Sequence, residues 1–520
     1  MRFEQIKSFF PKNKKEVFYI FALLAVTIPL RFINLGYSDY IGDEHKTFIE
    51  PSSDQSVKDF FLTRRKGPMQ FLITALSIGA VGDYRNELAV RVPHTVFSVM
   101  SVLMFYALVK KFTKSPEIGF VAAMLLSFNG FIVGFGRIAQ YQNQNLFFSF
   151  AALYFYLDLL RKDDGHLKST LIGTLMFVLS FFSHWDAIFM LPQMVIIFGL
   201  FLISKKVTPK NKIKLVLTNF ALGCLLILPF FLPYWKIQQK TPANIRYLTR
   251  RLDVGYSNIE RYEQLIDLYN PFLTLEFYIV TAFLGLIWWK MSWSHLIWFA
   301  LNFGVFELFV RKPGTHIYNF LIPVFILSAI GIVNLIKVTP KYFKQVLIGL
   351  VTLFMTYFFY QSYMVFVDHQ TEYPWNNETF LTFLCKDMEE MNMLTPCGEF
   401  IVNNFETPDY GLDDKLPFFG FPLSRNWNEV NEIVDADMVE NNLKGYGFIT
   451  NEEKSISQWY MNATYRADRG YYQVGIRKPL SYREDYQFQH LSGKVFIAEL
   501  RSDDDKLLAK VWRLDPENEK

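Results

Sequence analysis

Two adjacent carboxylates, Asp43 and Glu44, are the first residues of the chain that could do chemistry. They lie a few residues after the apolar run "FYIFALLAVTIPLRF" and are followed directly by His45 and Lys46. A carboxylate can take the proton from a hydroxyl group that attacks a second substrate. Neighbouring carboxylates repel each other, so we expect at least one of them to pair with a cation or a metal ion. The structural alternative is that the two acids cap an interfacial helix, since acids are favoured at helix N-termini.

A cationic turn occurs far downstream, in the segment "VRKPGTHIYN". Arg311 and Lys312 stand there between two closely spaced apolar runs, and His316 follows them. Cations kept at helix ends on the outer side of a membrane commonly hold an anion such as a lipid phosphate. The plainer alternative is that they anchor the helix ends to lipid headgroups. We therefore predict a phosphate site that contains Arg311, Lys312 and His316.

Other polar segments fall on the same predicted outer side, namely "TRRKGP", "GRIAQYQNQN" and "SHWDA". The last of these supplies His184 and Asp186. An acidic pair that faces cations at a membrane surface suits one reaction well. The carboxylate takes the proton from an acceptor hydroxyl, while Arg and Lys stabilise the charge on a departing phosphate. A sugar on a polyprenyl phosphate would be such a donor, with its lipid tail between helices.

The elements that position these residues are mostly apolar. Of the 520 residues, 51% are hydrophobic and only 20% are charged, which is too apolar for an ordinary soluble enzyme. Runs long enough to cross about 30 Å of hydrocarbon recur from about residue 16 to residue 366. We predict about eleven spanning helices, at 16–33, 91–111, 117–135, 145–161, 168–183, 187–204, 213–233, 271–289, 294–310, 317–336 and 345–366.

Lysine and arginine concentrate on cytoplasmic loops, and this rule orients the chain. The N-terminal segment is rich in both residues, and so are the predicted turns near 110–114, 205–214 and 337–344. These turns fall on one side only if the short run 68–82, which opens with proline, lies at the outer interface or dips partway into the membrane instead of crossing it. If it crossed, every later loop would change sides. We predict a plasma-membrane protein with a cytoplasmic N-terminus.

The polar remainder of the chain differs in character. We predict a transmembrane domain over 1–366 and an extracytoplasmic soluble α/β domain over 367–520. In the latter, "GKVFIAEL" and "LLAKVWRL" alternate like the strands of a hairpin, and "SRNWNEVNEIVDADMVENNL" has apolar residues at helical spacing. Acceptor recognition or covering of the active cavity is the role expected for this domain. Its tryptophans could stack on sugars, but most are more simply explained as core.

Net charge and cysteine content add little. The net charge of +4 gives no argument for a nucleic-acid partner. Three cysteines are too few for a disulfide scaffold or a zinc cluster. We expect Cys224 in the core, whereas Cys385 and Cys397 could either pair outside the cell or remain buried thiols.

The order of the motifs resembles the C-type-fold membrane glycosyltransferases. It is most similar to the dolichyl-phosphate-mannose protein mannosyltransferase-like group, which includes the bacterial transferase that adds aminoarabinose to lipid A. The matching segments cover roughly residues 16–366 and are "RFINLGYSDYIGDEHKTF", "KGPMQFLI", "RVPHTVFSVMSVLMFYALVKKF", "GFVAAMLLSFNGFIVGFGRIAQYQ" and "THIYNFLIPVFILSAIGI". The Trp-Trp-Asp signature of the oligosaccharyltransferase branch of this fold is absent.

The resemblance implies roles for particular residues. Asp43 would be the general base, with Glu44 in support, and Lys66 matches a lysine that the family uses near the donor phosphate. The outer segment 234–270 resembles the mobile loop near the donor cavity of the family. The arginine of the fourth segment is Arg137, which we assign to the donor phosphate.

One departure from the family pattern concerns metal binding. The family usually has an aspartate about five residues after Arg137, where this chain has Gln142. An amide such as Gln140 or Gln142 can bind sugar hydroxyls but is a poor metal ligand. Asp186 could substitute for the missing acid, with His184 as a ligand, a substrate contact or a packed residue. No cofactor is implied with certainty, and a divalent metal ion stays open.

Together these features predict an integral-membrane inverting glycosyltransferase. Its partners would be the bilayer, a polyprenyl-phosphate sugar and a hydroxyl acceptor on protein, glycan or lipid. A polytopic transporter or flippase for a lipid-linked or anionic substrate is the alternative. A transporter should carry charges near the middle of its spans and show repeated halves, which this chain does not. A catalytically inactive relative that acts as an assembly partner is a third reading.

Overall fold

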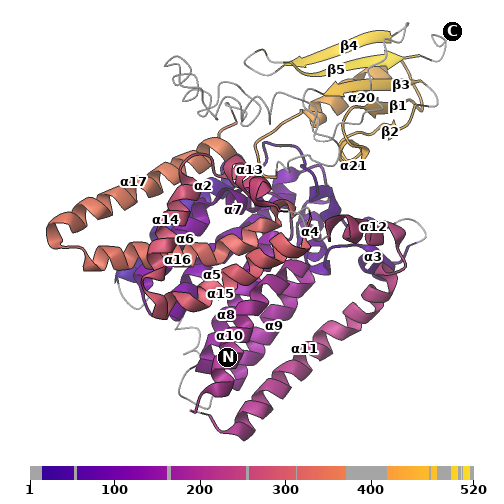
Figure 1. Ribbon diagram of the computed structural model, residues 1–520. Coiled ribbons are helices and arrows are strands. Elements are labelled where there is room, and N and C mark those ends of the chain that lie inside the picture. The colour runs from indigo at the N-terminus through magenta and orange to yellow at the C-terminus, as the bar shows by residue number, and fades with distance from the viewer. Residues whose placement is uncertain are drawn as a thin grey trace. The chain divides into compact units, whose positions relative to one another are not determined.

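The computed structural model (Figure 1) describes residues 14–51, 55–160, 166–205, 207–252, 257–311, 313–369, 419–467, 470–476, 494–501, 505 and 507–515. The chain divides into two compact units. The first, which we call the helical unit, comprises Met1–Ile33, Ile49–Leu76 and Val92–Val367. The second, the mixed unit, comprises Asn34–Phe48, Ser77–Arg91 and Asp368–Lys520. The chain passes from the helical unit to the mixed unit between Val367 and Asp368, and two earlier segments also belong to the mixed unit.

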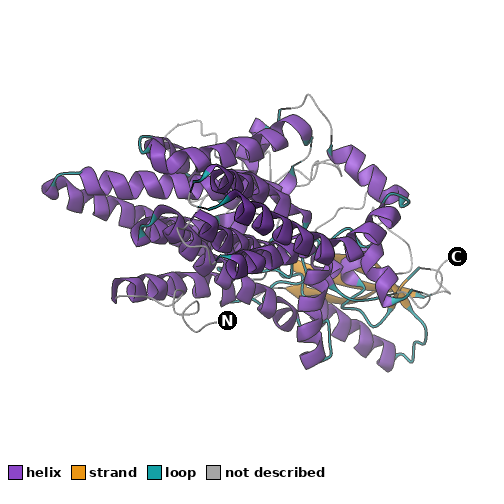
Figure 2. Ribbon diagram, turned by 90° about the horizontal axis from the view of Figure 1, so that it is seen from below, coloured by secondary structure: helices purple, strands orange, loops and turns teal. Residues whose placement is uncertain are grey.

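Helices make up the described part of the helical unit (Figure 2). In chain order they are α2 (Lys14–Phe32), α3 (Val57–Thr63), α4 (Pro68–Val81), α5 (Glu87–Thr113), α6 (Pro116–Phe128), α7 (Gly130–Gly136), α8 (Gln142–Tyr156), η2 (Leu157–Leu160), α9 (Leu167–Ser183), η3 (Trp185–Met190), α10 (Leu191–Ile203), α11 (Pro209–Gln238), α12 (Pro242–Arg251), α13 (Ile259–Tyr269), α14 (Thr274–Leu286), α15 (Trp289–Phe309), η4 (Gly314–Ile317), α16 (Tyr318–Val338) and α17 (Lys341–Phe366). The last turns of α4 and the first turn of α5 are counted with the mixed unit.

Every predicted span overlaps one of these helices or a consecutive pair of them, and the run predicted at 68–82 is helix α4. Among the described residues, five helices are long and apolar enough to cross a bilayer, and the pair α6 and α7, bent by 67°, makes a sixth if it is counted as one span. Helices α9 and α14 are apolar but shorter. These helices confirm a helical membrane part but not the predicted number of spans.

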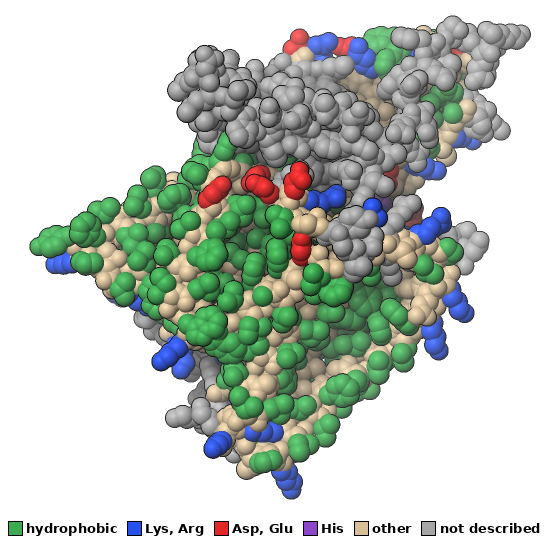
Figure 3. Space-filling model, in the orientation of Figure 1, with side chains coloured by type: hydrophobic (Ala, Val, Ile, Leu, Met, Phe, Trp, Pro, Cys, Tyr) green, Lys and Arg blue, Asp and Glu red, His purple; other side chains and the backbone are tan. Residues whose placement is uncertain are grey.

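Helix α16 lies at the centre of the helical unit, where α14, α15 and α6 pack against it. Of its most apolar window 72% is buried, compared with 6% in α11 and in α17. Helices α11 and α17 nevertheless have high hydropathy. Their apolar side chains therefore lie on the outside, and Figure 3 shows hydrophobic side chains along both helices. An exposed apolar surface of this extent is what a helix presents to lipid.

Two helices, α12 and α13, lie in the segment 234–270, which the sequence analysis treats as a loop. Both alternate charged and apolar residues, so no long apolar run reveals them. In α13, Tyr262, Leu265, Ile266 and Tyr269 are buried. Their spacing of three and four residues places them on one face of the helix. Cys224, predicted in the core, is a half-buried free thiol in α11, while Cys385 and Cys397 lie outside the described residues.

The mixed unit contains a five-stranded sheet in the order β2-β1-β3-β5-β4. Its strands are β1 (Gly447–Thr450), β2 (Thr464–Tyr465), β3 (Tyr471–Ile476), β4 (Lys494–Arg501) and β5 (Leu507–Leu514). Strand β1 pairs in parallel with β2 and β3, and β5 pairs antiparallel with β3 and β4. The β4–β5 pair confirms the hairpin predicted at the end of the chain. The mixed sheet confirms the α/β class.

Helix α20 (Trp427–Glu440) is the helix that was predicted from apolar spacing in this unit. It buries Trp427, Val430 and Val434. Trp427 stacks on Tyr460, with ring centroids 6.4 Å apart. These contacts make Trp427 a core residue. Of the other tryptophans considered for sugar stacking, Trp459 packs edge-on against Phe48, and Trp375 lies outside the described residues.

Candidate active site

Glu44 of the first loop is held by three hydrogen bonds to its carboxylate. It lies in the short helix η1 (Glu44–Thr47) of the mixed unit, and its side chain is 0% exposed. Arg91 of α5 donates to its carboxylate twice, from Nε to Oε1 at 2.9 Å and from Nη2 to Oε2 at 2.7 Å. The backbone N–H of Ile41 also donates to Oε2, at 2.9 Å. The prediction that one of the two acids pairs with a cation is confirmed for Glu44.

The same arginine holds the rest of the loop. Arg91 donates to the carbonyl oxygens of Leu35, Ser38 and Asp39 at 2.7 to 3.0 Å. The guanidinium of Arg91 thus donates to a carboxylate and to three backbone carbonyl oxygens, which uses most of its N–H donors. Glu44 and Arg91 therefore fix the loop's shape.

Asp43, next to it, is in a different environment. Its side chain is 33% exposed and forms an ion pair with Lys46, one turn later in the same short helix. Asp43 occupies the N-cap position of η1, but its side chain makes no capping hydrogen bond there. The capping alternative thus gains no support for Asp43. A partly exposed carboxylate on a braced loop is accessible to a substrate hydroxyl.

Residues near the end of the chain brace this loop within the mixed unit. Arg425 is 2% exposed and donates from Nη2 to the carbonyl of Tyr40 at 2.7 Å. It also forms an ion pair with Glu452 at 3.0 Å, and its backbone N–H donates to Asp39. Burial raises the pKa of Asp39, although the charge of Arg425 opposes this. The C-terminal part of the mixed unit therefore shapes the loop that carries Asp43.

A second cluster lies in the helical unit, around Asp186 at the start of η3. This carboxylate is 3% exposed. The Nδ1 atoms of His184 and His316 lie 2.8 Å and 2.9 Å from its oxygens. The hydroxyl of Tyr318 donates to Oδ2 at 2.8 Å, and Asn319 Nδ2 lies 3.4 Å from the same atom. Two predicted segments, "SHWDA" and "THIYN", therefore meet at one carboxylate.

Tyr141 extends the cluster to two further predicted segments. Its ring stacks on His184, with centroids 3.6 Å apart and an angle of 13° between the planes. His184 in turn lies parallel to His316 at 5.5 Å. Lys66 Nζ is 5.1 Å from the centroid of the Tyr141 ring. The helical unit thus gathers Lys66, Tyr141, His184, Asp186 and His316 from four separate segments.

The two predicted sugar-binding amides flank Tyr141 in sequence. Gln140 and Gln142 are each 1% exposed. The backbone carbonyl of Gln140 lies 3.2 Å from Nδ1 of His94. Within the described part of the chain, Gln140 Nε2 and Gln142 Oε1 have no hydrogen-bond partner. Buried polar atoms are normally paired, so these two amides call for a ligand or a water molecule.

The remaining predicted cations are placed differently. Arg137 is 4% exposed and donates from Nη1 to the carbonyl of Leu30 at 3.0 Å, which ties the segment before α8 to α2. Arg311 is exposed, and its backbone N–H donates to the carbonyl of Arg251 at 2.8 Å. Arg251, at the end of α12, was not predicted as a site residue, although it adds a second cation beside Arg311. Lys312 lies outside the described residues.

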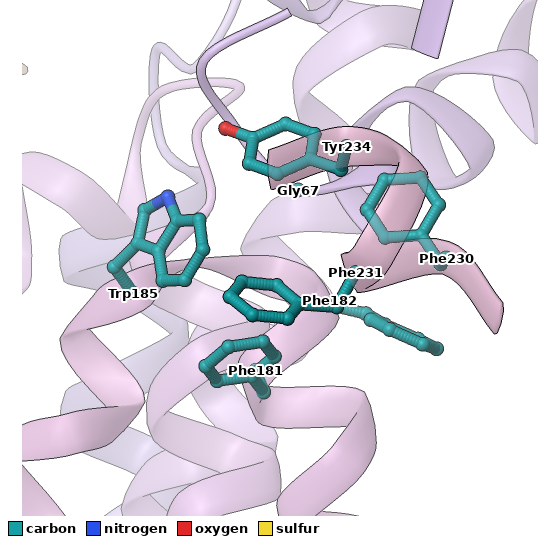
Figure 4. Close-up of a pocket in the computed structure, with 7 residues that line it drawn as sticks. All are labelled: Gly67, Phe181, Phe182, Trp185, Phe230, Phe231 and Tyr234. Carbon is teal, nitrogen blue, oxygen red and sulfur yellow. The ribbon is translucent and has the colours of Figure 1, made fainter. Parts of the chain in front are cut away.

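An apolar pocket adjoins the cluster (Figure 4). It is lined by Gly67, Phe181, Phe182, Trp185, Phe230, Phe231 and Tyr234. Aromatic rings from the end of α9 and from α11 form its walls, and Gly67 brings the backbone close. A Cβ atom added at Gly67 would lie 1.9 Å from the carbonyl oxygen of Phe182. Only glycine therefore allows this approach directly after Lys66.

Sequence reasoning missed Arg91, Tyr141, Tyr318 and Asn319. All four stand inside the quoted motifs, in "RVP", "AQYQ" and "HIYN". The signal was present, but aromatic and amide residues at helix ends in an apolar chain resemble core or interface residues. For metal binding, His184, Asp186 and His316 offer ligand atoms that all lie within 4.8 Å of one another.

Comparison with known proteins gives one family match. Residues 65–236 match the family model described as dolichyl-phosphate-mannose-protein mannosyltransferase. The chain is 25% identical over 321 residues to an uncharacterized protein of Aquifex aeolicus (strain VF5), a match that takes in 58% of this chain and 60% of that protein.

The fold is similar to that of ArnT from Cupriavidus metallidurans. The crystal structure of ArnT in the apo state gives a TM-score of 0.55 at 10% identity, covering 98% of this chain and 100% of ArnT. The structure bound to undecaprenyl phosphate gives 0.56 at 11% identity, covering 95% and 98%. At these identities the likeness is one of fold.

Proposed function

We propose that this chain, which belongs to the protein mannosyltransferase family of C-type-fold membrane glycosyltransferases, moves a sugar from a polyprenyl-phosphate donor to a hydroxyl acceptor with inversion. Family membership supports transfer of a sugar in general. The donor, the acceptor and the stereochemistry are the specific parts of the proposal.

One observation carries the proposal. In the helical unit, a polar cluster and an apolar pocket share the same short segments. Lys66 belongs to the cluster and Gly67, the next residue, lines the pocket. Trp185, which stands between His184 and Asp186 in the sequence, also lines the pocket. A polar cluster beside a small aromatic pocket suits the junction of an amphiphile, where an anionic head joins a hydrocarbon tail. A polyprenyl phosphate has this chemistry.

The proposed reaction assigns one step to each group. Asp43 takes the proton of the acceptor hydroxyl as the acceptor oxygen bonds to the anomeric carbon. The bond from that carbon to the phosphate oxygen breaks, and its electron pair leaves with the polyprenyl phosphate. Lys66 stabilises the charge on the departing phosphate. Gln140 and Gln142 would supply hydrogen bonds to the sugar hydroxyls through the buried amide atoms described above.

Purified protein with labelled polyprenyl-phosphate sugars tests the function. We expect one donor to lose its labelled sugar and release polyprenyl phosphate in an acceptor-dependent way. Loss of label from none of the donors, in preparations that remain folded and monodisperse, would count against a transferase.

Binding of undecaprenyl phosphate tests the donor site by itself. Trp185→Ala removes a large aromatic wall of the pocket and should weaken binding by about 10-fold or more, since burying such a side chain contributes roughly 1.5–3 kcal/mol. Trp289→Ala is the matched control, because Trp289 is 56% exposed on α15. Equal binding of undecaprenyl phosphate by the two variants would show that the apolar pocket is not part of the donor site.

A further inference from the structure

We propose that His184, Asp186 and His316 bind a divalent transition-metal ion, of which Zn²⁺ is the best match. The site lies wholly within the helical unit. His184 comes from the turn between α9 and η3, Asp186 from η3, and His316 from η4, 130 residues further along the chain than Asp186. This part of the inference does not depend on the proposed function.

The ligand types select the metal. Two imidazoles and one carboxylate suit Zn²⁺ and related first-row ions, whereas Mg²⁺ and Ca²⁺ prefer sets made of oxygen alone. Three protein ligands are also the usual number at zinc sites that keep one position open. Cys224 is a free thiol on α11 and takes no part in the cluster.

The distances require only a small adjustment. Ligand atoms about 2.1 Å from a tetrahedral zinc ion lie about 3.4 Å apart. Here the His184 and His316 Nδ1 atoms lie 2.8 Å and 2.9 Å from Asp186 oxygens. An opening of about half an ångström at each histidine–aspartate contact would bring these pairs to the spacing of zinc ligands, and all three ligand atoms already lie within 4.8 Å of one another.

One contact favours a cation at this position. The backbone N–H of Asp186 lies 3.2 Å from His184 Nδ1 and can donate to this nitrogen when the nitrogen carries a lone pair. The same nitrogen lies 2.8 Å from the Asp186 carboxylate, which also carries lone pairs. Two acceptors at this distance repel each other unless a cation or a proton lies between them. A metal ion accepts from both.

The surroundings match those of a ligating group. Tyr318 and Asn319 contact the Asp186 carboxylate, and Tyr141 stacks on His184 and fixes the plane of its ring. Hydrogen-bonded neighbours of this kind orient the ligands at metal centres. Lys66 lies beside Tyr141. If the proposed function holds, the open position of the metal and Lys66 would share the donor phosphate between them.

Metal content measured on the full chain in detergent, without any donor, tests the site. The protein is stripped with a chelator, incubated with Zn²⁺ and desalted, and the metal is then counted by mass spectrometry. We expect about one Zn²⁺ per chain, at least a tenfold loss in Asp186→Asn and in His316→Gln, and retention in His316→Cys, because thiolate is a good zinc ligand. His295→Gln is the matched control, since His295 is fully buried in α15 and packs against Phe112.

Three outcomes would overturn the site. In the first, the wild-type protein retains no more zinc than Asp186→Asn. In the second, all variants retain zinc equally. In the third, zinc is lost in His295→Gln and not in the Asp186 and His316 variants. If Asp186→Asn fails to fold, Co²⁺ in the His316→Cys variant gives a second measurement, because its absorption bands report a thiolate ligand. Sugar transfer is measured in separate samples. Sugar transfer by a protein that fails to bind Zn²⁺ would leave the proposed function standing, so failure of the metal site and failure of the proposed function can be told apart.

Discussion

Arg91 and Glu44 form a bidentate ion pair inside the mixed unit, with Nε to Oε1 at 2.9 Å and Nη2 to Oε2 at 2.7 Å. Their side chains are only 2% and 0% exposed. The pair lies one residue away from Asp43, whose side chain is 33% exposed. Two neighbouring acids thus have different environments. The buried one holds the loop, and the accessible one is available for proton transfer.

Breaking the buried pair should destabilise the protein strongly. Arg91→Met leaves the Glu44 carboxylate buried without its cation, which typically costs about 3–5 kcal/mol. Thermal unfolding in detergent would show this as a large fall in Tm. Lys46→Ala is the control, because it breaks the exposed Asp43 pair and should cost no more than about 1 kcal/mol. A similar loss of stability in both variants would show that the buried Arg91–Glu44 pair contributes no more than the exposed Asp43–Lys46 pair.

Asp43→Asn should remove activity without removing the fold. An amide cannot accept the acceptor proton, and loss of a general base typically lowers a rate by about 100-fold to 10,000-fold. The Tm and the binding of undecaprenyl phosphate should stay at wild-type values, since Asp43 contacts Lys46 on a partly exposed loop. Asp59→Asn, which changes an exposed acid at the start of α3, is the matched control for the assay. Turnover at the wild-type rate in Asp43→Asn would exclude Asp43 as the base.

Hydropathy predicted where the helices lie but not how they end. The span predicted at 145–161 corresponds to α8, which begins at Gln142 and continues into the turn η2. Polar residues such as Gln142 and Asn145 extend this helix beyond its apolar run, because they are buried inside the unit. Helices α12 and α13 were missed for the opposite reason. Helix α13 buries one face and α12 contains several arginines, so neither has a continuous apolar run.

The candidate site could be predicted in its residue types but not in its contacts. His184, Asp186 and His316 were expected on one surface, yet their meeting depends on how η3 packs beside the start of α16. No local pattern encodes a contact between residues 130 positions apart. Arg91 was predicted only as part of a spanning helix. The sequence does not show that its ion-pair partner is Glu44, which lies in a different segment.

Alanine substitutions at Gly67 and Gly79 distinguish an effect of close packing from an effect of helix propensity. Gly67→Ala would place a Cβ atom 1.9 Å from the carbonyl oxygen of Phe182, so the backbone beside the apolar pocket would have to shift. We expect a loss of about 1–3 kcal/mol in stability and weaker binding of undecaprenyl phosphate. Gly79, in α4, has nothing within 4 Å of such an atom. Gly79→Ala should therefore leave binding unchanged and stabilise the helix by up to about 1 kcal/mol. Thermal unfolding and lipid binding measure both effects, and the reverse order would contradict the packing shown at Gly67.

Asp267 in α13 should make stability depend on pH. Burial, together with the charges of Glu263 and Glu276, raises its pKa from 3.8 to about 6. The folded chain therefore binds this proton more tightly than the unfolded chain does. Stability from this group is present at low pH and is lost as the pH rises through about 6.

Unfolding of Asp267→Asn between pH 5 and pH 8 tests this dependence. The variant has no charge to bury, so its Tm should exceed that of the wild type at pH 8, and the difference should shrink toward pH 5. Glu263→Gln is the companion variant. It removes one of the charges that raise the pKa, so the transition should move to lower pH. Other titrating groups affect all three proteins alike and cancel in the differences. Curves for Asp267→Asn that run parallel to the wild type over this range would show that Asp267 is not the group responsible.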